Sequence, residues 1–236
     1  MSKEHSSRPW LAPKQWGAVL AVVLGFLAYK VPEWIVTGLA PALLPLLPTN
    51  ENVRLFALHG LFEALAIGAV FMLVVWFNSS FKELGLNRFK LEFIYKAILA
   101  WSAYFVITAS VMYVMQQVMH VPDDPQNIGY SNPNALEMAL AFLALVIVVP
   151  IAEELLFRGF IFKGIRSQYS FVVSALAVSV LFGVAHGQLN VGIDTFCLSL
   201  VLCYLVEKTN SLWPGILVHA LKNAVAFVLI FIYNVR

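Results

Sequence analysis

Apolar residues fill most of this chain in long stretches, and polar residues gather in the short connections between them. A helix needs about 20 apolar residues to cross the hydrocarbon core of a bilayer. The pattern predicts seven such helices, near residues 16–47, 53–78, 91–119, 134–165, 170–187, 190–206 and 211–234. The first stretch contains KVPEW, Pro41 and Pro45. It is therefore expected to form either a kinked helix or a helix followed by a re-entrant piece.

The composition fits a membrane protein and excludes other classes. Hydrophobic residues make up 61% of the chain and charged residues only 12%, whereas a soluble domain carries about twice that share of charge. The net charge of +2 and the lack of a basic stripe argue against a nucleic-acid partner. We expect an all-α, polytopic membrane helical bundle of about seven helices, within a range of six to eight. Residues 1–236 would form one integral membrane domain, with the lipid bilayer as its main partner.

The charges in the connections predict an orientation. The connection at 79–90 contains Lys82, Arg88 and Lys90, whereas 120–133 has two aspartates and no lysine or arginine. Lysine and arginine favour the cytoplasmic side of a membrane. We expect a multi-pass protein of the cell membrane, with the N-terminus and 79–90 cytoplasmic and the C-terminus on the other side.

Several polar side chains lie inside the predicted spans of the second half. An ionisable group near the bilayer centre costs about 2.5–3.5 kcal/mol, so each one needs a partner or a use. Glu154 and Arg158 are four residues apart and share a helix face, as do His219 and Asn223. At about 1.5 Å per residue, these groups and His186 lie at overlapping depths. The sequence therefore predicts one polar cavity within the membrane.

This set of groups is suited to peptide hydrolysis. A carboxylate with an imidazole can take a proton from water, and a second imidazole or a metal can polarise the carbonyl group. A carboxamide N–H can stabilise the oxyanion that results. The candidate catalytic residues are Glu153, Glu154, His186, His219 and Asn223. Glu154 is preferred over Glu153 as the base, because it shares a face with Arg158, which can hold it ionised, and the reverse assignment stays open.

Three short motifs carry a family resemblance. The stretches EELLFR, FGVAH and HALKN resemble the motifs EExxxR, FxxxH and HxxxN of the CAAX-protease and bacteriocin-processing family, also called the Abi family of intramembrane proteases. All three are complete and in order. The resemblance covers roughly residues 134–230, the expected catalytic core, and adds Arg158 and Phe182 as supporting residues.

The resemblance implies a multi-span helical protease with its catalytic groups in a membrane cavity. Glu153 and Glu154 would include the water-activating carboxylate, His186 would be its partner, and His219 with Asn223 would be the remaining ligand or oxyanion group. The family is often labelled a metalloprotease, yet a metal-free glutamate mechanism is also proposed for its CAAX members. Zn²⁺ bound by Glu154, His186 and His219 and a metal-free mechanism both stay open, since the chain has no HExxH pair.

Three functions from different classes remain. The first is an intramembrane endopeptidase acting on hydrophobic or lipidated peptides, either prenylated C-termini or leader and bacteriocin-type peptides. The second is a catalytically silent immunity or scaffolding protein on the same fold. The third is a proton-coupled transporter, which is disfavoured because no inverted repeat is visible.

Each polar residue also has an ordinary structural explanation. Arg158 could extend along its helix to the interface, and a single buried histidine usually bonds one backbone carbonyl. His59 and Glu63 are four residues apart but isolated in the first half, so we expect mutual pairing or a polar contact to the cavity. Lys222 is expected to reach an interface or pair with a carboxylate, and it is not assigned to catalysis.

Overall fold

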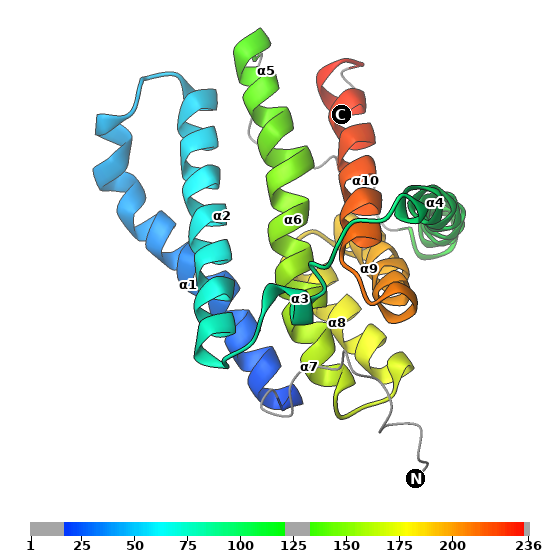
Figure 1. The fold of residues 1–236 in the computed structure, drawn as a ribbon. Coiled ribbons are helices and arrows are strands. Elements are labelled where there is room, and N and C mark those ends of the chain that lie inside the picture. Colours follow the sequence, from blue (N-terminus) through cyan, green and yellow to red (C-terminus); the bar gives the residue numbers. More distant parts are fainter. Residues whose placement is uncertain (1–16, 121–132, 234–236) are drawn as a thin grey trace.

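The protein is a bundle of helices in the computed structural model, which describes residues 17–120 and 133–233 (Figure 1). The separate long helices are α1 (Ala18–Leu43), α2 (Glu51–Trp76), α4 (Glu92–Met119), α8 (Phe171–Ala185), α9 (Leu189–Thr209) and α10 (Trp213–Phe231). A further helical segment over 135–166 is built from α5 (Ala135–Phe142), η3 (Leu143–Val148), α6 (Val149–Glu153), η4 (Glu154–Phe162) and α7 (Lys163–Arg166). Two short helices, η2 (Leu44–Leu46) and α3 (Phe81–Leu84), lie in connections.

Six of the described helical segments are long and apolar enough to cross a membrane. The all-α polytopic bundle expected from the sequence is therefore confirmed, and the protein is a multi-pass membrane protein. The stretch predicted at 170–187 corresponds to α8, which has 15 residues. At 1.5 Å per residue α8 is roughly 22 Å long, shorter than a bilayer core of about 30 Å.

The first predicted span is one helix followed by a short helical turn. Helix α1 continues through Pro32 and Pro41, and Pro45 lies in η2, after which the chain turns into α2. The re-entrant alternative is therefore not what the chain adopts here. Helices α1 and α2 form a hairpin beside the 135–166 segment (Figure 1). Gly25 permits the close approach of α1, because a Cβ there would lie 2.4 Å from the Ile161 side chain.

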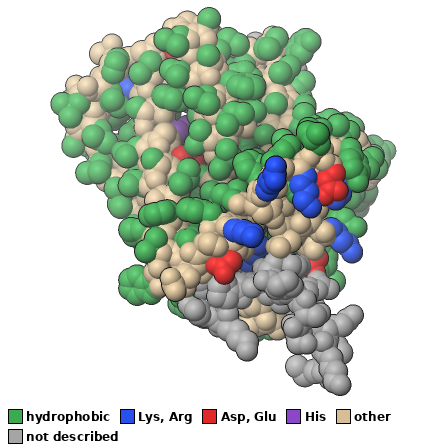
Figure 2. Space-filling model, viewed as in Figure 1, with side chains coloured by type: hydrophobic (Ala, Val, Ile, Leu, Met, Phe, Trp, Pro, Cys, Tyr) green, Lys and Arg blue, Asp and Glu red, His purple; other side chains and the backbone are tan. Residues whose placement is uncertain are grey.

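Charged residues gather at the end of the bundle that holds α3 and α7. Figure 2 shows Lys, Arg, Asp and Glu side chains together in the lower part of one face, whereas hydrophobic side chains cover most of the rest. Lys163 Nζ donates to the Glu83 carbonyl at 2.6 Å, and the Leu212 amide donates to the Gly85 carbonyl at 2.9 Å. Gly85 has a φ of 107°, a conformation that favours glycine. The 79–90 connection is thereby fixed against α7 and the α9–α10 turn.

At the opposite end, Glu137 links α2 to α5. Its carboxylate accepts hydrogen bonds from the side chains of Asn50 and Asn52, each at 2.6 Å, and from Asn134 at 2.7 Å. These bonds account for a buried carboxylate without any catalytic role. The expected orientation across the membrane stays a prediction. Residues 1–16 and most of the 120–133 connection, on which it also depends, lie outside the described residues.

Helices α8 and α9 pack at very short range. A Cβ on Gly183 would lie 2.7 Å from the Gly192 carbonyl oxygen, so the two backbones are in direct contact. The Ser179 hydroxyl donates to the Ser199 hydroxyl across the same interface at 2.8 Å. Small residues and shared hydroxyl bonds are typical of helix pairs within membranes. This contact fixes the end of α8, where His186 lies.

Candidate active site

The first motif lies where an α-helix changes into a π-helix. Helix α6 ends at Glu153, and the π-helical stretch η4 begins at Glu154. Isolated π-helical turns widen a helix locally and occur frequently at functional sites. The two adjacent glutamates differ in exposure: the Glu154 side chain is fully buried, whereas that of Glu153 is 16% exposed.

Glu154 is held by two donors. Its Oε1 accepts from Arg158 Nη1 at 2.8 Å and lies 3.1 Å from His219 Nδ1. The Arg158 guanidinium is also fully buried and lies 4.3 Å from the centre of the Phe182 ring, a cation–π contact. Arg158 therefore does not extend to the interface. It binds Glu154, which makes Glu154 a buried structural anion.

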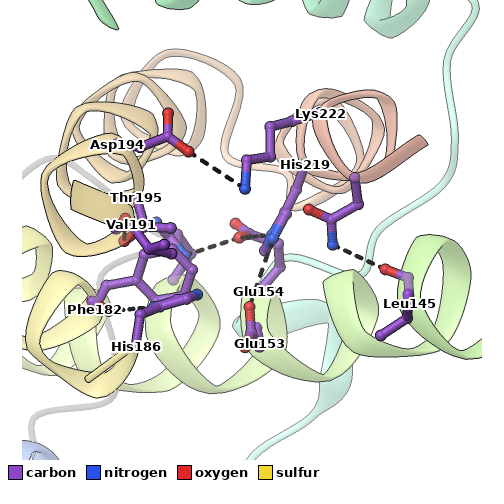
Figure 3. A network of polar contacts seen from close by, with 12 residues as sticks. Leu145, Glu153, Glu154, Phe182, His186, Val191, Asp194, Thr195, His219 and Lys222 are labelled. Carbon is purple, nitrogen blue, oxygen red and sulfur yellow. Dashed lines mark hydrogen bonds and ion pairs between the residues drawn. The ribbon is translucent and has the colours of Figure 1, made fainter. Parts of the chain in front are cut away.

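His219 lies between the two glutamates (Figure 3). Its Nδ1 faces Glu154 and its Nε2 lies 3.5 Å from Glu153 Oε2. Glu154 is paired with Arg158 and is therefore an acceptor, so His219 Nδ1 must be the donor. This bond fixes the imidazole and directs Nε2 toward Glu153.

His186 lies at the C-terminal end of α8. Its Nδ1 is 2.8 Å from the Phe182 carbonyl oxygen, which can only accept, so Nδ1 carries the proton. In the neutral ring, Nε2 is then left as a proton acceptor. The Phe182 ring packs between the two histidines, with its centre 4.8 Å from that of His186 and 5.9 Å from that of His219. The second motif thus supplies both an imidazole and the aromatic ring that positions it.

Asn223 is bound to a second π-helical stretch. Its Nδ2 donates to the Leu145 carbonyl in η3 at 2.8 Å. A carboxamide nitrogen has two hydrogens. One serves this structural bond, and the other is left for a second acceptor.

Most of the candidate catalytic side chains line one cavity of about 310 Å³. Glu153, His186, His219 and Asn223 line it, together with Lys222. Glu154 is not among the lining residues and reaches the site only through His219. Lys222 Nζ pairs with Asp194 at 3.4 Å, as Figure 3 shows, which is one of the two roles expected for it.

The first half of the chain contributes three more polar residues to the cavity. Tyr29 on α1 and both His59 and Glu63 on α2 line the same space. The sequence signal was the four-residue spacing of His59 and Glu63, which places both on one helix face. Their place in the cavity wall is one of the two outcomes expected for this pair. Tyr29 had no such signal, since a lone tyrosine in a span is usually a packing residue.

The residues expected to bind Zn²⁺ do not fit a metal as they are arranged. Within 17–120 and 133–233, no three His, Cys, Asp or Glu side chains are grouped to hold an ion. Glu154 forms an ion pair with Arg158, and the buried positive charge of Arg158 would repel a cation beside it. His219 Nδ1 is directed to Glu154 and His186 Nδ1 to a backbone carbonyl.

Comparison with known proteins supports the resemblance carried by the motifs. Residues 135–225 match the family model described as type II CAAX prenyl endopeptidase Rce1-like. The chain resembles the Rce1-like endopeptidases. The resemblance to the CAAX-protease and bacteriocin-processing family is thus confirmed over the segment that contains all three motifs.

A curated relative agrees with this match. The chain is 31% identical over 77 residues to the Bacillus subtilis (strain 168) protein named "Putative membrane peptidase YdiL". The aligned part covers 33% of this chain and 32% of the relative, so the chain spans about a third of that protein's length. No solved structure matches the chain.

Proposed function

We propose that the protein is an intramembrane endopeptidase that hydrolyses peptide bonds of hydrophobic or membrane-associated peptides. The observation that carries this proposal is the placement of the Glu153 carboxyl group in a cavity shared with His186, His219 and Asn223. A carboxyl group and an imidazole facing one space can activate a water molecule. The match of residues 135–225 to a family of endopeptidases supports the same reaction.

Glu153, not Glu154, is the base in this proposal. Sequence spacing favoured Glu154 because of Arg158, but that ion pair is fully buried and binds Glu154 Oε1, and Glu154 does not line the cavity. Glu153 takes a proton from the water molecule, and the water oxygen adds to the carbonyl carbon of the peptide. His186 Nε2 accepts a hydrogen bond from the same water and orients it.

The negative charge that develops on the carbonyl oxygen is stabilised by the third motif. The second Nδ2 hydrogen of Asn223 donates to the oxyanion. His219 donates from Nε2 when that nitrogen is protonated, and Glu154 beside Nδ1 balances the positive charge of the ring. Glu154 and Arg158 are thus positioning residues, because they act through His219.

This mechanism uses no metal, because Glu154 is paired with the buried Arg158 and the Nδ1 atoms of His186 and His219 are bonded elsewhere. Chelator treatment tests this part separately. We expect the same cleavage rate after incubation with a strong chelator and removal of the metal–chelator complex. A rate that falls and returns when Zn²⁺ is added would show that the site rearranges to bind the ion.

The substrates we propose are CAAX-type prenylated peptides or leader and bacteriocin-type peptides. Apolar side chains line part of the cavity beside the polar ones, including Phe62, Phe227 and Phe231. Such a cavity fits an extended hydrophobic peptide better than a polar one. The description of the matching family supports testing prenylated C-terminal peptides first.

The test is cleavage of a set of membrane peptides by the purified protein, with mass spectrometry of the products. Glu153→Gln and His186→Ala should abolish cleavage while the protein stays folded. Glu33→Gln is the matched control, because it removes a carboxylate that lies in α1, is paired with Lys30 and does not line the cavity. Full activity in Glu153→Gln would instead favour the catalytically silent scaffold.

A further inference from the structure

Glu63 is a second carboxyl group in the cavity, on the side formed by the first half of the chain. It lies on α2, is only 6% exposed and lines the same space as Glu153. A buried carboxyl group within a membrane span is costly, and such groups are usually retained for function. Neither the three motifs nor the mechanism above uses Glu63.

The Glu63 carboxyl group differs from the other buried carboxylates in having no hydrogen-bond donor. Glu154 is held by Arg158 and His219, and Glu137 by three asparagine side chains. Across the described residues, no hydrogen bond or ion pair reaches Glu63. The group is therefore available to bind a molecule that occupies the cavity.

Glu63 on α2 and Glu153 on α6 line the same cavity, and these two helices are in contact. Tyr29 on α1 lines that cavity as well, so the three side chains reach one space from three helices. Two carboxyl groups in a site of low polarity do not both ionise readily, because like charges repel and burial disfavours charge. When two such groups lie close together, one can hold a proton and act as an acid while the other acts as a base.

We propose that Glu63 is the general acid that protonates the leaving nitrogen of the peptide, with Glu153 as its paired base. This inference rests on the proposed endopeptidase function. Glu153 removes one proton from water, and the hydroxide oxygen forms a bond to the carbonyl carbon. The C–N bond then breaks as Glu63 transfers its proton to nitrogen. The proton on Glu153 passes back to Glu63 through water in the cavity, which restores the starting state.

Other titratable and charged groups face this pair from the surrounding helices. They are Tyr29 of α1, His59 of α2, His186 at the end of α8, and His219 and Lys222 of α10. Lys222 is paired with Asp194, and His219 with Glu154. Among the cavity-lining residues, Glu63 and Glu153 are thus the two carboxyl groups between which a proton can be shared.

The test compares two substrates that differ only in the leaving group. One is a hydrophobic peptide that the wild-type protein cleaves, and the other has the scissile amide replaced by a phenyl ester with a good phenolate leaving group. A phenolate departs without a proton, whereas an amide nitrogen does not. Glu63→Gln should lower kcat for the peptide by about 10²–10⁴, with KM little changed, and leave ester hydrolysis near the wild-type rate.

Three further variants make the outcome decisive. Glu153→Gln should lose both activities, because water activation is needed for both substrates, and Glu33→Gln should retain both. Glu63→Asp keeps an acid but withdraws it by one methylene, so it should lower the peptide rate more than the ester rate. This variant decides the matter if Glu63→Gln does not fold. An equal change on the two substrates, or no change, overturns the role of Glu63.

The same variants and substrates distinguish a failure of the Glu63 role from a failure of the proposed endopeptidase function. A wild-type protein that cleaves neither substrate contradicts the endopeptidase function, and the role of Glu63 fails with it. If Glu153→Gln is inactive while Glu63→Gln matches Glu33→Gln on both substrates, the endopeptidase function stands. In that case only the assignment of Glu63 as the acid is wrong.

Discussion

Adjacent residues in this protein have opposite surroundings, and the difference decides their chemistry. Glu153 faces a cavity, whereas Glu154 is fully buried and forms an ion pair with Arg158. A buried charge is tolerated when a partner and hydrogen bonds compensate for the lost water. Glu154 meets this condition through Arg158 and His219. Glu153 has only the longer contact to His219 and is open to substrate.

The two glutamates should therefore respond differently to the same substitution. Glu153→Gln is expected to abolish cleavage with little change in Tm. Glu154→Gln leaves the Arg158 charge buried without its partner, which typically costs about 3–5 kcal/mol. We expect a clear loss of thermal stability in detergent and, because His219 loses its anchor, a loss of activity as well. Equal Tm values for the two variants would contradict the structural role of Glu154.

Asn223 combines a structural bond with a role in the reaction. Asn223→Ala should reduce cleavage by about 10²–10³ and leave measurable activity, since one oxyanion donor is lost and the rest of the site remains. Asn223→Asp is the matched variant of nearly the same shape without N–H donors. It should be at least as defective, because its carboxylate would also repel the oxyanion. Wild-type rates in Asn223→Asp would rule out the donor role.

At the scale of the helices, close backbone contacts hold the catalytic groups in place. Helix α8 is too short to span a bilayer by itself, and its packing against α9 through Gly183 and Gly192 sets the position of His186. The π-helical stretches η3 and η4 have a related effect within the 135–166 segment. Stretch η3 contains the Leu145 carbonyl that accepts the hydrogen bond from Asn223, and η4 begins at Glu154.

Gly183→Ala tests this packing. The added methyl group would lie 2.7 Å from the Gly192 carbonyl, so α8 must move away from α9. Forcing extra volume into a packed interface costs about 1–3 kcal/mol, and displacement of His186 should lower kcat as well. Gly38→Ala in α1 is the control, because nothing lies within 4 Å of its added Cβ. Its activity should match the wild type, and its stability should not fall, because alanine is favoured over glycine within a helix.

At the scale of the whole molecule, charge lies at the ends of the bundle and apolar surface between them. The 79–90 connection, α7 and the α9–α10 turn lie together at one end, joined by Lys163 and by the backbone bond from Leu212 to Gly85. The links from Glu137 lie at the other end. This division fits a protein that crosses the membrane repeatedly.

The predicted orientation can be tested by cysteine labelling in intact cells. Lys82→Cys and Glu51→Cys place exposed thiols near opposite ends of α2. Both are made in a background where the buried Cys197 and Cys203 are replaced by alanine. An impermeant reagent should label position 51 and not position 82, because basic connections favour the cytoplasm. The reverse pattern would show that the N-terminus faces outward.

The sequence by itself determined the membrane class, the approximate helices and the three motifs. Long apolar stretches allow few structures in a bilayer, because every backbone polar group must be bonded within a helix. Four-residue spacing was also sufficient to pair Glu154 with Arg158, a bond the structure contains. These features depend on neighbours along one helix, which sequence spacing describes directly.

Only the tertiary structure decided which glutamate faces the cavity and which residues of the first half join it. The rotation of a helix about its own axis depends on the helices packed against it, and here packing directs Glu153 to the cavity and Glu154 to Arg158 and His219. Glu63 and Glu153 are far apart along the chain, and they share a cavity because α2 packs against α6. Contacts of this kind arise from packing between distant segments, which local spacing does not encode.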